Sequence, residues 1–250
     1  MRESEKKMDQ PTFGSLFSGI GGMDLGLERA GGRCAWQVEN DTYCNRVLEK
    51  HWPDVQKFGD IRDVTDPPSV DLIAGGFPCQ DVSNAGNKEG ISGARSGLWT
   101  EMFRIVCLVR PRFVLVENVP GLLVRGMDAV LGDLAKGGYD AEWDCIPAAA
   151  FGCDHIRWRT FILAYPLSSR CERILCGGNL RIKKAMGRSS STALGAMCAT
   201  VQRLEDRLGK SSVFRTSYGL TSQLDRLANI GNSVVPQVAE WLGRRILEVI

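Results

Sequence analysis

The sequence lacks the features that mark several protein classes. No apolar run among its 250 residues is long enough to span a membrane, and the polar start, residues 1–7, has no apolar core of the signal-peptide kind. The nine cysteines include no Cys-x-x-Cys pair, and there are only two histidines. A disulfide framework and a metal site are therefore not expected. These absences predict a cytoplasmic protein that does not associate with membranes.

The charge is unevenly distributed along the chain. The formal net charge is only +2, and the content of 44% hydrophobic and 24% charged residues is ordinary for one large globular domain. Residues 1–167 carry 18 basic against 23 acidic side chains, whereas residues 168–215 carry 10 against 3. A concentrated basic segment on a neutral body indicates a polyanion partner. A solvated linker of like charges is the alternative interpretation.

The N-terminal part follows a nucleotide-binding pattern. An apolar strand over residues 12–17 leads into Ser18-Gly19-Ile20-Gly21-Gly22 and then a helical pattern, and such a turn lets backbone N–H groups approach a ligand. The next strand, residues 33–38, ends at Glu39, where an acid can accept hydrogen bonds from ribose hydroxyls. A third segment ends at Asp60. Either acid could instead cap a helix.

A cysteine stands at the end of the next apolar strand. Residues 70–74 predict a short buried strand that stops at Gly75-Gly76-Phe77-Pro78-Cys79-Gln80. Open α/β sheets place their chemistry at the carboxyl ends of strands. A lone cysteine is most often a small buried apolar residue. Here the rigid proline before it and the polar, glycine-rich loop from Asp81 to Gly97 favour a reactive cysteine in a binding segment.

Further strand ends carry charged residues. A strand over residues 112–116 ends at Glu117, whose carboxyl group would be partly desolvated and its pKa raised; a solvated acid is the alternative. Arg157 and Arg159 precede the apolar run 160–165, and on an extended segment they would point to the same face, toward phosphate or carbonyl oxygens. Helical patterns cover residues 98–109, about 124–135 and the C-terminus.

The order of these motifs resembles one enzyme family. Phe-x-Gly-x-Gly-Gly, two acids, Pro-Cys-Gln, Glu-Asn-Val, Arg-x-Arg and Gly-Asn-Ser-Val-Val-Pro span residues 17–236 in the sequence order of the DNA (cytosine-5)-methyltransferases, here of the short bacterial or phage type. The resemblance implies an α/β fold: a Rossmann-like class I methyltransferase sheet with helices on both faces. Residues 1–166 and 223–250 would form this catalytic domain, and residues 167–222 a short basic target-recognition insert.

The resemblance also implies the roles of individual residues. Cys79 would add to C6 of a cytosine flipped out of duplex DNA, Glu117 would protonate N3, Arg159 would bind the ring carbonyl, and Arg157 would order the nearby loop. The implied cofactor is S-adenosyl-L-methionine, bound by Phe17, Gly19, Gly21, Gly22, Glu39, Asp60, Ile61, Pro78, Leu98 and Asn232. The implied DNA contacts are Gln80, Ser83, Arg95, Arg181, Lys183 and Lys184.

The implied protein is a monomer that acts on double-stranded DNA, with a cognate restriction endonuclease as a further partner. Three alternatives stay open: a dinucleotide-dependent oxidoreductase with the same glycine turn, a tRNA cytosine-5 methyltransferase of the same fold, and a catalytically silent DNA-binding relative. The chain departs from the family at His155, where glutamine is typical, and a structural histidine is the preferred interpretation there.

Overall fold

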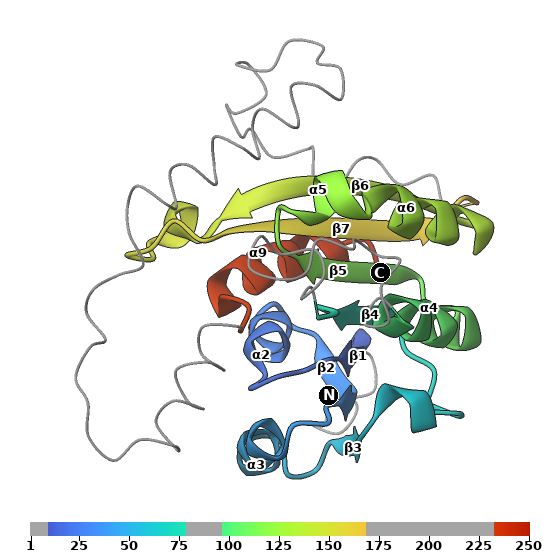
Figure 1. The fold of residues 1–250 in the computed structure, drawn as a ribbon. Coiled ribbons are helices and arrows are strands. Elements are labelled where there is room, and N and C mark those ends of the chain that lie inside the picture. The colour runs from blue at the N-terminus through green and yellow to red at the C-terminus, as the bar shows by residue number, and fades with distance from the viewer. Residues whose placement is uncertain (1–9, 79–96, 169–232) are drawn as a thin grey trace.

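The computed structural model describes residues 10–78, 97–168 and 233–250, which build an open α/β fold on one seven-stranded sheet (Figure 1). The strand order is β3-β2-β1-β4-β5-β7-β6. The parallel strands are β1 (Thr12–Leu16), β2 (Arg33–Val38), β3 (Gln56–Phe58), β4 (Leu72–Gly75) and β5 (Phe113–Asn118). The edge strand β6 (Tyr139–Pro147) and β7 (Trp158–Pro166) complete the sheet, with β7 antiparallel to both of its neighbours.

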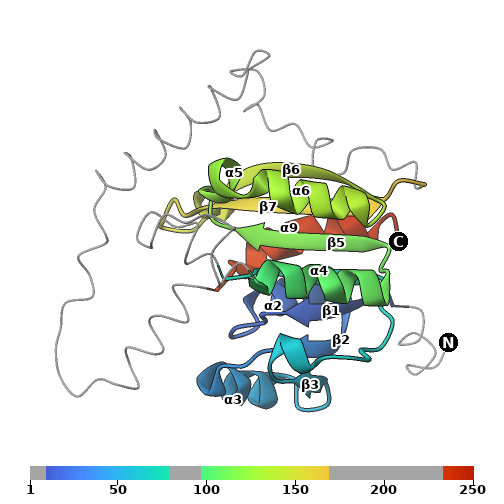
Figure 2. The same ribbon diagram turned by 45° about the vertical axis from the view of Figure 1, so that its right-hand side comes forward.

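Helices cover both faces of the sheet (Figure 2). One face carries α4 (Gly97–Val109) and α6 (Met127–Lys136), with the short α5 (Leu122–Arg125) before α6. The other face carries α2 (Gly22–Arg29) and α9 (Pro236–Leu247). The remaining described helices are α3 (Thr42–His51) and the 3₁₀ turns η1 (Ile61–Asp63) and η3 (Ala148–Phe151). The predicted Rossmann-like fold with helices on both faces is therefore confirmed.

Strand β5 shows how the sequence divides the core in two. Val114 and Val116 belong to the buried cluster beneath α4 and α6, whereas Phe113 and Leu115 belong to the cluster beneath α2 and α9. Successive side chains of a strand point to opposite faces, so an uninterrupted apolar run supplies both cores. All six residues of β5 are buried, including Glu117.

Close packing of α2 against α9 joins the C-terminal residues to the N-terminal half. A Cβ atom at Gly26 would lie 2.4 Å from the Ala239 Cβ, and one at Gly22 would lie 2.2 Å from the Ser233 Oγ. Only glycine permits this approach, because a larger residue would push the two helices apart. Residues 233–250 thus pack against the N-terminal half of the fold, and the division into a catalytic domain of residues 1–166 and 223–250 and an insert of residues 167–222 stays a prediction.

One predicted helix is in fact two. The pattern over residues 124–135 indicates a single helix, but the chain forms α5 and α6 with Gly126 between them. Gly126 has a φ of 158°, which no helical residue adopts, so the chain turns between the two elements. None of the helices in the described ranges combines the length and apolarity that crossing a bilayer requires.

Helix α2 places a carboxyl group inside the core. Asp24 is fully buried between α2 and the first two strands, and its Oδ1 accepts a hydrogen bond of 3.2 Å from the Gln37 side chain. Burial raises the pKa of Asp24 to about 6, an increase that contacts with Ser15 and Gln37 partly oppose. The ionised carboxylate therefore lowers the stability of the fold at neutral pH.

We predict that the pH dependence of stability distinguishes Asp24→Asn from the wild type. Because the pKa of Asp24 is raised in the folded state, the protonated carboxyl group contributes to the free energy of unfolding. This contribution is fully present below the pKa of the unfolded state and is lost as the pH rises through about 6. Between pH 5 and pH 8 the wild type should lose about 1–2 kcal/mol of unfolding free energy relative to the variant. Urea unfolding across this range measures the difference, and parallel curves for the two proteins would contradict it.

Candidate active site

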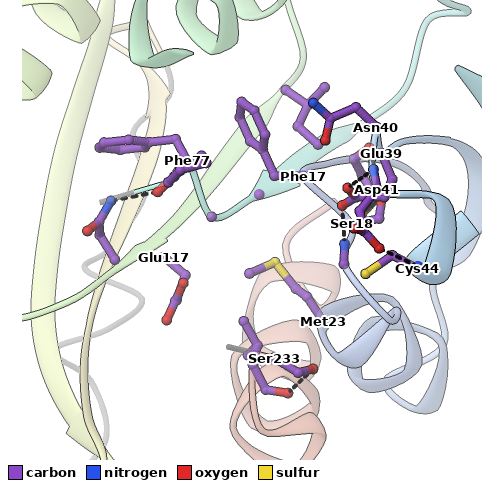
Figure 3. Close-up of a pocket in the computed structure, with 18 of the residues that line it drawn as sticks. Phe17, Ser18, Met23, Glu39, Asn40, Asp41, Cys44, Phe77, Glu117 and Ser233 are labelled. Carbon is purple, nitrogen blue, oxygen red and sulfur yellow. Dashed lines mark hydrogen bonds between the residues drawn. The ribbon is translucent and has the colours of Figure 1, made fainter. Parts of the chain in front are cut away.

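A cavity of about 540 Å³ opens at the carboxyl ends of β1, β4 and β5 (Figure 3). Its volume is within the range of small-molecule and cofactor sites. The strand order reverses between β1 and β4, so the cavity occupies the crevice where open α/β sheets bind their ligands. In Figure 3, Ser18, Glu39 and Asp41 lie on one side and Phe77 and Glu117 on the other.

The turn after β1 forms the first wall of the cavity. Phe17 and Gly19 both have left-handed φ values, 54° and 56°, and for the phenylalanine this conformation is strained. The Gly19 N–H donates to Glu39 Oε2 at 2.7 Å, and the Asp41 N–H donates to Glu39 Oε1 at 2.8 Å. Two backbone hydrogen bonds therefore fix the carboxylate of Glu39, and each oxygen keeps a lone pair for a ligand hydroxyl.

A partly buried ion pair forms the opposite wall. Arg159 Nε lies 2.9 Å from Glu117 Oε1. The register explains the contact: Glu117 of β5 is opposite Phe161 of β7, which makes Arg159 its diagonal neighbour across the antiparallel pair. Gly76 leaves room for the carboxylate, since a Cβ there would lie 2.6 Å from Glu117 Oε2.

The electrostatics of this wall suit proton transfer. Burial raises the pKa of Glu117, and the charges of Arg159 and Arg157 oppose that increase. The alternative of a solvated strand-end acid is wrong, because Glu117 is only 8% exposed. Burial favours the protonated form of this carboxyl group and the two cations favour the ionised form, so the site has groups that act on the Glu117 proton in both directions.

Arg157 differs from the sequence expectation. It lies before β7 rather than on an extended segment, and its φ of 33° is in the left-handed region. Arg157 Nη2 donates to the backbone oxygen of Ser233 at 2.8 Å, so the two arginines bind different partners. Burial, followed by the charge of Arg159, lowers the pKa of Arg157 to about 10. Arg157 thus links the Arg-x-Arg run to the segment before α9.

The structure brings together half a dozen of the predicted site residues. Those that line the cavity are Phe17, Gly19, Glu39, Pro78, Glu117 and Arg159. Eight others lie outside the described residues: Cys79, Gln80, Ser83, Arg95, Arg181, Lys183, Lys184 and Asn232.

The remaining predicted cofactor residues lie elsewhere. Gly21 and Gly22 line a second cavity, of about 520 Å³, beside α2 and α3, and the exposed His155 also lines it. Asp60 caps η1, because its side chain accepts a hydrogen bond of 2.9 Å from the Arg62 N–H. Capping was the alternative role that the sequence left open for this acid. Ile61 is buried in the core, and the partly buried Leu98 packs against this core cluster.

Several residues that line the cavity were not predicted from the sequence as site residues. These are Ser15, Ser18, Asn40, Asp41, Phe77 and Ser233. Most of them stand next to a predicted strand end, so the rule that ligands bind beyond the carboxyl ends of strands could have found them. Ser233 belongs to the Gly-Asn-Ser-Val-Val-Pro motif, and it lines the cavity because Gly22 lets Ser233 and Val234 lie against the start of α2.

The fold and the site define a class of protein. An open sheet with a cavity at its switch point, a glycine turn and an acid after the second strand is the arrangement of enzymes that bind nucleotide-type ligands. The family model for the C-5 cytosine-specific DNA methylases matches residues 12–196. The chain therefore belongs to the C-5 cytosine-specific DNA methylase family.

Curated relatives share the sequence over part of their length. Type II methyltransferase M2.BsuMI of Bacillus subtilis is 40% identical over 158 residues, which are 60% of this chain and 41% of that protein. Type II methyltransferase M.DsaV of Dactylococcopsis salina is 37% identical over 169 residues, 64% of this chain and 47% of that protein. The chain thus matches less than half the length of these relatives.

Solved structures share the fold. A protein described as a DNA modification methyltransferase encoded within an E. coli prophage superposes with a TM-score of 0.54 at 26% identity, covering 65% of this chain and 49% of that one. The S. pombe Dnmt2 methyltransferase superposes with a TM-score of 0.56 at 21% identity, covering 68% and 56%. At that identity the second likeness shows the fold alone.

We predict that Arg159→Gln raises the pKa of Glu117 further. The substitution removes the strongest opposing charge while burial of the carboxyl group remains. Titration of ¹³C-labelled glutamate side chains by NMR measures the change. Arg244→Gln, which breaks an exposed pair with Glu240, is the matched control and should leave Glu117 unchanged. A Glu117 titration unaffected by Arg159→Gln would contradict the electrostatic role of the pair.

Proposed function

We propose that this protein transfers a methyl group from S-adenosyl-L-methionine to C5 of a cytosine flipped out of duplex DNA. The observation that carries the proposal is the shared cavity: the Glu117–Arg159 pair, the Glu39 carboxylate and Pro78, the residue before Cys79, all line it. Membership in the C-5 cytosine-specific DNA methylase family and the names of the type II relatives support the same activity.

The first wall of the cavity suits the cofactor. The Glu39 carboxylate, fixed by two backbone N–H groups, would accept hydrogen bonds from ribose hydroxyls, and Phe17 offers an aromatic ring for the adenine. The cofactor supplies a methyl group on a sulfonium ion. The remaining predicted contacts stay part of the proposal: Gly21, Gly22, Asp60, Ile61 and Leu98 do not line this cavity, and Asn232 lies outside the described residues.

The opposite wall suits the base. C5 of cytosine is a poor nucleophile, so the Cys79 thiolate first adds to C6 while N3 takes a proton from Glu117. Arg159 binds the ring carbonyl and stabilises the negative charge that develops on it. The electron pair of the resulting enamine would let C5 form a bond to the methyl group, while the bond from that methyl group to the cofactor sulfur would break and the sulfur would leave as a neutral thioether. The N3 proton would then return to Glu117. Loss of the C5 proton, with water as the base, then expels the thiolate and restores the C5–C6 double bond.

The proposed substrate is double-stranded DNA. The target base cannot be reached within the duplex, so it leaves the stack and enters the cavity. The basic segment 168–215, which includes Arg181, Lys183 and Lys184, would bind the phosphate backbone, and Gln80, Ser83 and Arg95 would contact the vacated site. The proposed protein is a cytoplasmic monomer, and a cognate restriction endonuclease is the proposed partner because the curated relatives are type II methyltransferases.

We predict that Cys79→Ala abolishes methyl incorporation from labelled S-adenosyl-L-methionine into unmethylated duplex DNA. The thiol is the proposed nucleophile, and its loss should leave affinity for the cofactor nearly unchanged. DNA that contains 5-fluorocytosine should trap the wild type as a covalent adduct and fail to trap the variant. Activity that persists in Cys79→Ala would contradict the covalent mechanism, and wild-type transfer to tRNA alone would assign the chain to RNA.

We predict that Glu39→Ala weakens binding of S-adenosylhomocysteine about 10-fold or more while DNA affinity changes little. The variant removes charge-assisted hydrogen bonds on the cofactor side of the cavity. Calorimetry with the ligand and filter binding with DNA measure the two affinities. Glu49→Ala, an exposed acid on α3, is the matched control. Equal weakening of both ligands by Glu39→Ala would contradict the ribose assignment.

A further inference from the structure

A side-chain hydrogen bond joins the chain segments that follow β4 and β5 beyond their last ladder pair. The two parallel strands are paired as far as Gly75 and Val116, where β4 ends. Two residues further on, the side-chain amide nitrogen of Asn118 donates to the backbone oxygen of Phe77 at 3.1 Å (Figure 3). Both residues are buried and both line the cavity. Asn118 therefore holds the segment that leaves β4 against the end of β5.

The orientation of the Asn118 amide is fixed by its two partners. Asn118 Oδ1 accepts a hydrogen bond of 2.9 Å from the Val119 N–H, while the amide nitrogen donates to Phe77. A backbone N–H only donates and a backbone carbonyl only accepts, so the partners identify the oxygen and the nitrogen of the side chain. Because Asn118 is 2% exposed, water does not compete for these bonds. An apolar side chain of the same size would break both of them.

The ring of Phe77 supplies a second anchor. Phe77 packs on Trp99 of α4, with the ring centroids 5.4 Å apart. Trp99 is itself held in place, because its Nε1 donates to Asp133 Oδ2 of α6 at 3.0 Å. The carbonyl group and the ring of Phe77 are thus bound by two different parts of the fold. Phe77 is therefore fixed in both its backbone and its side chain.

The covalent structure carries this constraint toward Cys79. The oxygen that accepts from Asn118 belongs to the planar peptide group between Phe77 and Pro78. The ring of Pro78 holds its φ angle at about −65°. Once the Phe77–Pro78 peptide is fixed, the ψ angle of Pro78 is the one soft backbone torsion left before the peptide that leads to Cys79.

We propose that Asn118 is a positioning residue that fixes the Phe77–Pro78 peptide and thereby places Cys79 for attack on the base. The role of Cys79 as the nucleophile rests on the proposed function. Asn118 acts through Phe77 and Pro78, not on the reacting atoms. A displacement of about 1 Å at a reacting group can cost about 100-fold in rate, so a small movement of this peptide affects the reaction strongly.

Two variants of Asn118 remove the bond to Phe77 in different ways. Asn118→Asp keeps the size of the side chain and the acceptor for the Val119 N–H, but an ionised carboxylate cannot donate. Asn118→Ser has a side chain too short to replace the amide and adds no charge beside Glu117. Agreement between the two variants therefore separates the loss of the donor from the effect of a new charge.

The measurement is a single-turnover assay on the full chain at saturating S-adenosyl-L-methionine and duplex DNA. Each Asn118 variant should lower the rate of methyl transfer about 10- to 100-fold. The rate of covalent adduct formation with DNA that contains 5-fluorocytosine should fall by the same factor, because the addition of Cys79 precedes methyl transfer. The affinities for S-adenosylhomocysteine and for DNA should stay within about 2-fold of the wild type, since the bond acts on the nucleophile.

Tyr139→Phe is the matched control for a loss of stability alone. The Tyr139 hydroxyl donates a buried hydrogen bond of 2.8 Å to the backbone oxygen of Pro111, and neither residue lines the cavity. Its loss should lower the urea midpoint as the Asn118 variants do, while both rates stay at the wild-type value. Urea unfolding also shows that each variant is folded under the assay conditions. Should Asn118→Asp fail to fold, Asn118→Ser makes the same test.

Two results would overturn the inference while leaving the proposed function intact. One is a wild-type rate of adduct formation in a folded Asn118 variant, and the other is an equal loss of rate in Tyr139→Phe. Failure of the wild type itself to form the adduct would instead overturn the proposed function, and it is recognisable because it precedes any comparison of variants.

Discussion

The cavity depends on the close approach of backbones at one edge of the sheet. Gly22 allows Ser233 and Val234 to lie against the start of α2, and Gly76 leaves space for the Glu117 carboxylate beside the end of β4. A side chain at either position would displace a wall of the cavity by more than the tolerance of a ligand site. The glycines therefore act as spacers that set the width of the site.

Buried charge is the second constraint. Glu117, Arg157 and Asp24 lie in or beside the cavity and are largely withdrawn from water, which shifts the pKa of each away from its ordinary value. Such groups lower stability unless they are paired, and here only part of the cost is offset by partners. The apolar clusters on both faces of the sheet supply the stability that this edge lacks.

Much of the fold could be predicted because strand ends are marked in the sequence. The apolar run before Glu117 and the glycine turn after β1 indicate buried strands and their direction, and both are where they were expected. The prediction was wrong at Arg157, where a left-handed residue precedes the strand, because alternation of side chains cannot reveal a positive φ. The single helix over residues 124–135 was wrong for a similar reason, since Gly126 ends one helix and begins another.

By itself the sequence determined which residue types follow each strand. That order predicted the α/β class, the edge of the sheet at which the cavity lies, and the acids Glu39 and Glu117 at that edge. These features follow from local periodicity, which depends only on neighbours along the chain. Tertiary structure alone decided that Arg159 pairs with Glu117 and that Arg157 donates to the backbone oxygen of Ser233. Those contacts join residues distant in sequence, and only the packing of helices against the sheet sets their geometry.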